Sequence, residues 1–93
     1  MNDHSTQFVR SATSAGIDFT ITDLEVAFAL MQTALTTTDS ELALRTYNHA
    51  VRTLAETREL LGRASPTEEQ RSKLTAAMAA LEERLSVFRT RSP

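Results

Sequence analysis

Cysteine is absent from this 93-residue chain, and glycine and proline occur only twice each. Without cysteine the chain can form no disulfide, no thiolate zinc site and no cysteine nucleophile. The absence of cysteine also fits a cytoplasmic location, where disulfides are rare. So few helix breakers favour long helices joined by short loops. The chain has no apolar run near the ~20 residues that a membrane span needs. It also has no basic segment followed by an apolar stretch at its N-terminus, so we expect no signal peptide and a cytoplasmic location.

A dominant charge of one sign is lacking as well. Ten basic and twelve acidic residues give a net charge of −2, and the arginines do not cluster into a run. A nucleic-acid-binding surface usually shows a basic stripe, so we expect no nucleic acid and no membrane as partner. The hydrophobic fraction of 41% and the charged fraction of 24% are ordinary for one folded domain.

Three capping boxes predict where helices begin. In a capping box a Ser or Thr side chain and a Glu three residues later each bond the other's backbone N–H. The three pairs are Thr22 with Glu25, Thr38 with Glu41, and Ser65 with Glu68. Asp39 is a competing cap for the second helix. Pro66 suits the first position of the third helix, because its missing N–H would have no helical partner there.

Apolar residues at spacings of three and four follow each box and predict helices over residues 23–35, 40–61 and 66–89. The expected apolar faces are Leu24, Phe28, Met31 and Leu35 in the first helix; Leu44, Tyr47, Val51, Leu54 and Leu61, flanked by Ala43 and Ala50, in the second; and Leu74, Met78, Leu81, Leu85 and Phe88 in the third. We expect Gly62 to end the second helix in the left-handed conformation. Short connections place consecutive helices antiparallel, so the predicted fold is an all-α, up-down-up three-helix bundle over residues 22–91.

Residues 1–21 form an N-terminal extension, partly flexible in this interpretation, with spacing for a short helix before Gly16. Residues 17–22 alternate apolar and polar, which is the period of an extended strand. Two alternatives follow. The segment is an extended lead-in that places Phe19 and Ile21 on the core, or it pairs with the same segment of a second chain.

The predicted first helix is short for the hairpin that it must cover. At 1.5 Å per residue it spans roughly 20 Å, against roughly 33 to 36 Å for the other two. The far end of the hairpin then needs cover from the N-terminal segment, a second copy or a partner helix. We therefore expect an interaction surface there, made by Leu54, Arg58, Leu61, Leu74, Met78 and Phe19. Residues 5–21 packed over Leu61 and Met78 would remove the basis for this expectation.

The ionisable residues form no active-site pattern. His49 lies between Arg45 and Arg52 on the polar stripe of the second helix, where a metal cation would be repelled. Arg58 falls on the apolar seam of the same helix. Its stem runs along the core to water, or it pairs with an acid across the hairpin, or it binds a partner carboxylate. We expect no enzymatic activity, no metal and no cofactor.

Residues 42–54, Leu-Ala-Leu-Arg-Thr-Tyr-Asn-His-Ala-Val-Arg-Thr-Leu, resemble the second helix of MIT domains, and a similar stretch occurs in tetratricopeptide-type hairpins. Arg71, Leu74 and Arg84 are similar to the pattern of the third MIT helix. The resemblance covers residues 24–89 at most. No glycine lies in the first connection, the third helix is rich in alanine where the family carries bulkier residues, and no 34-residue repeat is visible. The resemblance implies a three-helix module that binds a peptide helix in a groove.

The sequence therefore predicts a small, bacterial-type interaction module that binds a partner helix or itself, a homodimer being one such form. The alternative is a structural or regulatory homo-oligomer with no separate ligand. An enzyme or a small-ligand-binding domain is the least favoured of the three.

Overall fold

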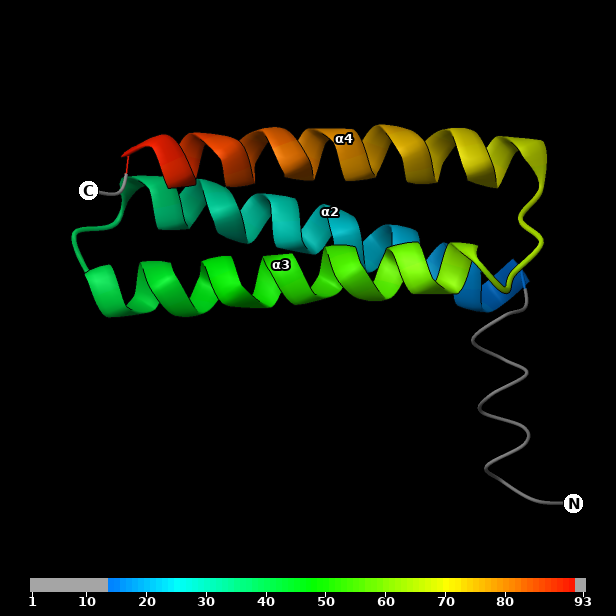
Figure 1. The fold of residues 1–93 in the computed structure, drawn as a ribbon, viewed down its shortest axis with the longest axis horizontal. Coiled ribbons are helices and arrows are strands. Elements are labelled where there is room, and N and C mark those ends of the chain that lie inside the picture. The colour runs from blue at the N-terminus through cyan, green and yellow to red at the C-terminus, as the bar shows by residue number, and fades with distance from the viewer. Residues whose placement is uncertain (1–13, 92–93) are drawn as a thin grey trace, which may run out of the picture.

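The computed structural model describes residues 14–91, which form three α-helices. They are α2 (Ser14–Thr36), α3 (Ser40–Leu61) and α4 (Glu68–Arg91). Each helix runs antiparallel to the one before it, and short connections join them at opposite ends of the bundle (Figure 1). The described residues contain no strand. The predicted all-α, up-down-up three-helix bundle is confirmed.

The first of these helices, α2, begins at Ser14 and not at residue 23, so the predicted start is wrong. Ile17 and Ile21 are buried and extend the apolar spacing of Leu24 backwards by two turns. Thr22 does not cap the helix, because its hydroxyl donates to the carbonyl oxygen of Asp18 at 3.3 Å, as an interior helical residue can. The alternation over residues 17–22 is therefore helical, and burial of the isoleucines outweighs the β preference of the segment. Residues 1–13 of the predicted extension lie outside the described residues.

The length mismatch also disappears. The helix α2 has 23 residues, against 22 in α3 and 24 in α4. Ile17 and Ile21 belong to the same apolar core against which Leu61 and Met78 pack. The end of the hairpin is thus covered by the chain's own residues, and the reason for expecting an interaction surface there is removed.

The buried side of α3 differs from the predicted one. Leu44 and Val51 were expected in the core but are 54% and 40% exposed. The buried positions are Ala43, Ala50, Leu54, Thr57 and Leu60. Buried alanines occur on α2 as well, and small side chains on both helices allow their backbones to approach closely. The inward side of α3 is therefore marked by its small side chains and not by its largest apolar ones.

Both ends of α3 were predicted at the correct residues. The cap is the competing residue Asp39, whose carboxylate accepts from the backbone N–H of Leu42 at 3.0 Å. At the other end Gly62 has φ −71° and is right-handed, so the left-handed conformation predicted for it is wrong. Its N–H donates to the carbonyl oxygen of Glu59 at 3.1 Å, which tightens the last turn instead.

The capping box of α4 lies two residues later than predicted. The Thr67 hydroxyl accepts from the N–H of Gln70 at 3.1 Å, and the Gln70 side-chain oxygen accepts from the N–H of Thr67 at 3.0 Å. The helix accordingly begins at Glu68 and not at residue 66. A capping box accepts Gln in place of Glu at its last position, so Thr67 with Gln70 replaces the predicted Ser65 with Glu68.

This correction is testable by two alanine substitutions. Thr67→Ala removes the cap and is expected to lower the free energy of unfolding by about 0.5 to 2 kcal/mol. Ser65→Ala is the matched control and is expected to change it by less than about 0.5 kcal/mol. Urea denaturation followed by circular dichroism measures both. A larger loss from Ser65→Ala than from Thr67→Ala would restore the original assignment.

Candidate functional site

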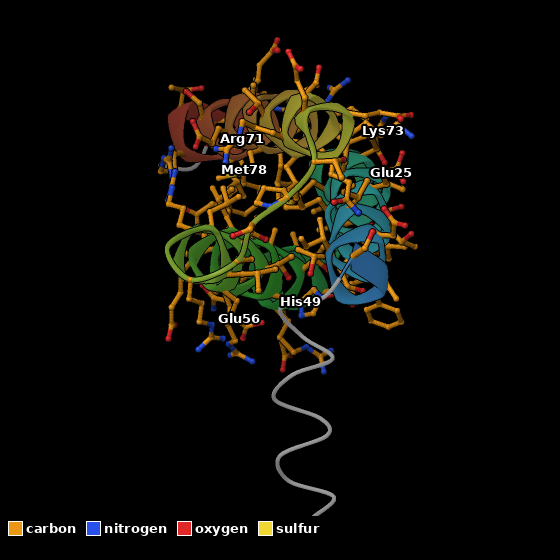
Figure 2. All side chains as sticks on the ribbon, turned by 90° about the vertical axis from the view of Figure 1, so that its right-hand side faces the viewer. Glu25, His49, Glu56, Arg71, Lys73 and Met78 are labelled. Atoms are coloured by element: carbon orange, nitrogen blue, oxygen red, sulfur yellow. The ribbon has the colours of Figure 1, made fainter. Side chains whose placement is uncertain are left out.

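The six residues predicted to form an interaction surface do not form one in the structure. Leu54 and Leu74 are buried, and Leu61 and Met78 are half-buried against the core. Met78 lies between α4 and α3 (Figure 2). Arg58 and Phe19 are exposed, but they belong to different sides of the bundle, as their contacts show.

Arg58 forms an ion pair with Glu82 of α4, the second of the three alternatives for this residue. Both side chains are about half exposed, so solvent screens the pair and it contributes little to stability. Further along the same side, the rings of Tyr47 and Phe88 stack with their centroids 4.7 Å apart. Arg89 donates to the Tyr47 hydroxyl at 3.2 Å. Long side chains from both helices thus bridge α3 and α4 along this side.

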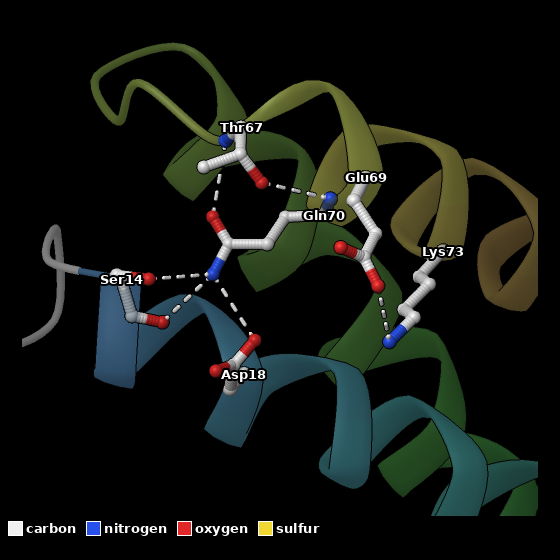
Figure 3. A network of polar contacts seen from close by, with 6 residues as sticks. All are labelled: Ser14, Asp18, Thr67, Glu69, Gln70 and Lys73. Carbon is white, nitrogen blue, oxygen red and sulfur yellow. Dashed lines mark hydrogen bonds and ion pairs between the residues drawn. The ribbon is translucent and has the colours of Figure 1, made fainter.

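A second polar cluster joins the start of α4 to the start of α2 (Figure 3). Gln70 is buried, and its side-chain nitrogen donates to the Ser14 carbonyl oxygen at 3.0 Å, the Ser14 hydroxyl at 2.9 Å and an Asp18 carboxylate oxygen at 3.0 Å. Its oxygen is already engaged by Thr67. Every polar atom of this side chain is therefore used in holding two helix ends together, which is a structural role.

Within residues 14–91 the remaining ionisable side chains do not gather into a metal site. No group of three or more His, Asp or Glu residues there could hold a metal ion. His49 is exposed on α3, as predicted. In the same part of the chain every buried side-chain nitrogen or oxygen has a hydrogen-bond partner. None of the described helices is long and apolar enough to cross a membrane.

Two grooves follow the sides of α2. One lies between α2 and α3, has a volume of about 650 Å³, and is lined by Ala15, Gly16, Phe19, Thr20, Asp23, Thr53, Glu56, Thr57, Leu60 and Arg63. The other lies between α2 and α4, has a volume of about 580 Å³, and is lined by Ile21, Leu24, Glu25, Phe28, Lys73, Ala76, Ala77 and Ala80. Glu25 and Lys73 mark this second side in Figure 2.

The α2–α3 groove is bordered by exposed apolar side chains of α2. Phe19, Val26 and Leu30 are 69%, 50% and 43% exposed. With Asp23 they are spaced by four, three and four residues, which places all of them on one side of a helix. Phe19 and Asp23 line the groove, so Val26 and Leu30 continue the same side of α2 toward its C-terminus.

The matching side of α3 is mostly polar. Leu42, His49, Glu56 and Arg63 recur every seven residues and form one line, of which Glu56 and Arg63 line the groove. His49 and Glu56 lie on the side of α3 turned away from α4 (Figure 2). We name these two lines together the α2–α3 face. It consists of Phe19, Asp23, Val26 and Leu30 of α2 with Leu42, His49, Glu56 and Arg63 of α3.

Of the six predicted surface residues, only Phe19 belongs to the α2–α3 face. Val26 and Leu30 were missed because they lie off the apolar face predicted for this helix, and because Phe19 was placed before the helix began. Once the helix begins at Ser14, the surface can be recognised from the sequence. Phe19, Val26 and Leu30 then lie on one side of the helix, and the buried residues lie on another.

Comparison of the chain with protein-family models, with curated protein sequences and with solved structures gives no match.

Proposed function

We propose that this chain is a protein–protein interaction module whose docking surface is the α2–α3 face. One observation carries the proposal, the line of three exposed, large apolar side chains beside a groove of about 650 Å³. Contiguous apolar side chains rimmed by polar groups mark interaction sites on many protein surfaces. Here Glu56 and Arg63 supply the polar rim, and Asp23 lies within the line itself, between Phe19 and Val26.

The energetics favour an apolar partner surface at this place. Burying a large apolar side chain is worth about 1.5 to 3 kcal/mol relative to leaving it in water. Phe19 alone, at 69% exposure, keeps most of its ring available for such burial. A helix laid into a groove contributes apolar residues at spacings of three and four, the spacing that Phe19, Val26 and Leu30 themselves present. The resemblance of residues 42–54 to a helix of peptide-binding MIT domains supports the same class of function.

The other surfaces of the bundle offer less. The α2–α4 groove is lined on α4 mainly by alanines, which bury little area, and its leucine and isoleucine are already buried in the core. On the α3–α4 side, Leu44 and Val51 are exposed next to a seam bridged by Tyr47 and Arg58. We also propose that the protein is bacterial and acts in the cytoplasm, and its lack of cysteine fits that location.

Site-specific photo-cross-linking in the source cells tests the proposal. A photoreactive phenylalanine analogue at Leu30, on the α2–α3 face, is expected to give a discrete protein adduct. The same analogue at Glu83, exposed on α4, is the matched control and is expected to give none. Equal labelling at both positions, or no adduct from Leu30, would overturn the assignment of the face.

A further inference from the structure

We propose that the occupant of the α2–α3 face is a second copy of this chain, docked antiparallel about a two-fold axis. This inference rests on the proposed function and names the partner. It follows from two patterns on different helices, one of charge and one of apolar side chains, which share the same centre.

The charge pattern lies on α3 along the outer border of the α2–α3 face, with which it shares Arg63. Glu41, Arg45, Glu59 and Arg63 are all exposed, and with Arg52 they follow the solvent side of the helix at spacings of four and seven. Read from either end, the pattern reverses sign about Arg52, since residue 41 is acidic where residue 63 is basic, and residue 45 is basic where residue 59 is acidic. Two such lines run antiparallel therefore bring opposite charges together at four places.

The apolar pattern lies on α2. Phe19 and Leu30 are equally far from a point between residues 24 and 25, and Val26 lies close to that point. Asp23 lines the same groove as Thr53 and Glu56, so this point and Arg52 are at about the same level of the bundle. One axis can therefore serve both helices.

The proposed two-fold axis lies in the interface, perpendicular to the helices, at this level of the bundle. Rotation about it packs α2 against α2 of the second copy and α3 against α3 of the second copy, each pair antiparallel. Phe19 then meets Leu30 of the second copy, and Val26 meets its Asp23 beside the axis. On α3, Arg45 meets Glu59 of the second copy, and Glu41 meets its Arg63. Such an interface is isologous, with the same patch used by both subunits.

The existing ion pairs on this side are compatible with the arrangement. Arg63 and Glu59 of one chain are 3.9 Å apart, at the outer limit of an ion pair, and their side chains are 47% and 73% exposed. A second copy adds an opposite charge to each of them without breaking that contact. Arg52 meets its own copy at the axis, where Glu56, one turn away on α3, offsets the repulsion.

The size of the face suits a stable dimer. Two helices packed about 10 Å apart, each about 10 Å wide and roughly 33 Å long, present roughly 650 Å². Two copies would bury roughly 1,300 Å² in total, which falls within the range of specific interfaces. Phe19 and Leu30, meeting twice by symmetry, supply the large apolar contacts that dominate such interfaces.

Analytical ultracentrifugation of the full chain between about 1 and 100 µM tests the inference. The wild type is expected to dimerise in this range. Phe19→Asp and Leu30→Asp are each expected to weaken the dimer by about a hundredfold or more, with unchanged helical circular dichroism because both positions are exposed. Leu44→Asp is the matched control, an exposed leucine outside the face, and is expected to dimerise like the wild type. A wild type that stays monomeric throughout would overturn the inference.

Charge reversal tests the antiparallel register. Arg45→Glu and Glu59→Arg are each expected to weaken the dimer by roughly tenfold, since each turns two symmetric attractions into repulsions. The double variant restores opposite charges and is expected to recover most of the affinity. Singles without effect, or a double variant as weak as the singles, would overturn this register. If the purified chain is monomeric while Leu30 cross-links to a different protein, the proposed function stands and this inference fails. If no adduct forms at all, the proposed function fails.

Discussion

Replacing Leu81 with alanine is expected to lower the free energy of unfolding by about 2 to 5 kcal/mol. Leu81 lies on α4, is fully buried, and belongs to the core that all three helices share. The truncation removes apolar contacts and leaves a cavity in the core. The three helices hold one another in place, so they cannot move together far enough to fill it. A domain of this size has a total stability of roughly 5 to 14 kcal/mol, so urea denaturation will show a large shift of the midpoint.

Leu44→Ala is the control for this prediction and removes the same atoms. Leu44 is 54% exposed, so the expected loss is below about 1 kcal/mol. The sequence placed both leucines on core faces, and only the structure separates them. Similar losses from the two variants would mean that α3 packs with the originally predicted side inward.

The contrast between these two leucines shows how far the sequence could go. Capping residues and apolar spacing predicted three antiparallel helices and both ends of α3, because these features depend on local chemistry. The side of α3 that faces inward depends on how closely α2 approaches it, which is a property of the pair. Hydrophobicity alone favours Leu44 over Ala43, although close helix packing requires the smaller residue.

The start of α2 was missed for a related reason. Ile17, Phe19 and Ile21 alternate with polar residues, and over six residues this is the pattern of a strand. Ile17, Ile21 and Leu24 also fit one side of a helix. The sequence alone does not favour this alternative, because it does not show that these residues pack in one core with residues of α4. The error passed directly into the site, because Phe19 then had no helical neighbours on its line and Leu30 was not seen as part of a surface.

Gln70→Glu is expected to lower the free energy of unfolding by about 2 to 3 kcal/mol near neutral pH. The substitution keeps the shape of the side chain but replaces the donor nitrogen with an oxygen. That oxygen would face the Ser14 carbonyl and the Asp18 carboxylate, which now receive hydrogen bonds at 3.0 Å each. The Ser14 carbonyl and the Asp18 carboxylate are left without their donor, while the Ser14 hydroxyl, now an acceptor at 2.9 Å, can turn to donate to the new oxygen. The new carboxylate is buried beside that of Asp18.

The helix dipole acts in the opposite direction, which makes the sign of this result informative. An acidic residue in the first turn of α4 is favoured by about 0.3 to 1 kcal/mol, and Glu68 and Glu69 already use this effect. A net loss therefore shows that the lost donor outweighs the dipole. Glu69→Gln is the matched control at the exposed neighbouring position. It breaks only the exposed ion pair with Lys73 at 3.3 Å and is expected to cost less than about 1 kcal/mol.

The loss from Gln70→Glu is also expected to shrink as the pH falls. In the unfolded chain the new carboxyl ionises freely, whereas in the folded protein burial beside Asp18 favours its protonated form. The folded state then binds more protons, so stability falls as the pH rises and recovers on acidification. Urea denaturation near neutral pH and at about pH 4, each relative to the wild type, measures this difference. A loss that is the same at both values would mean that the new side chain has turned out into solvent and that the tie between α2 and α4 is simply broken.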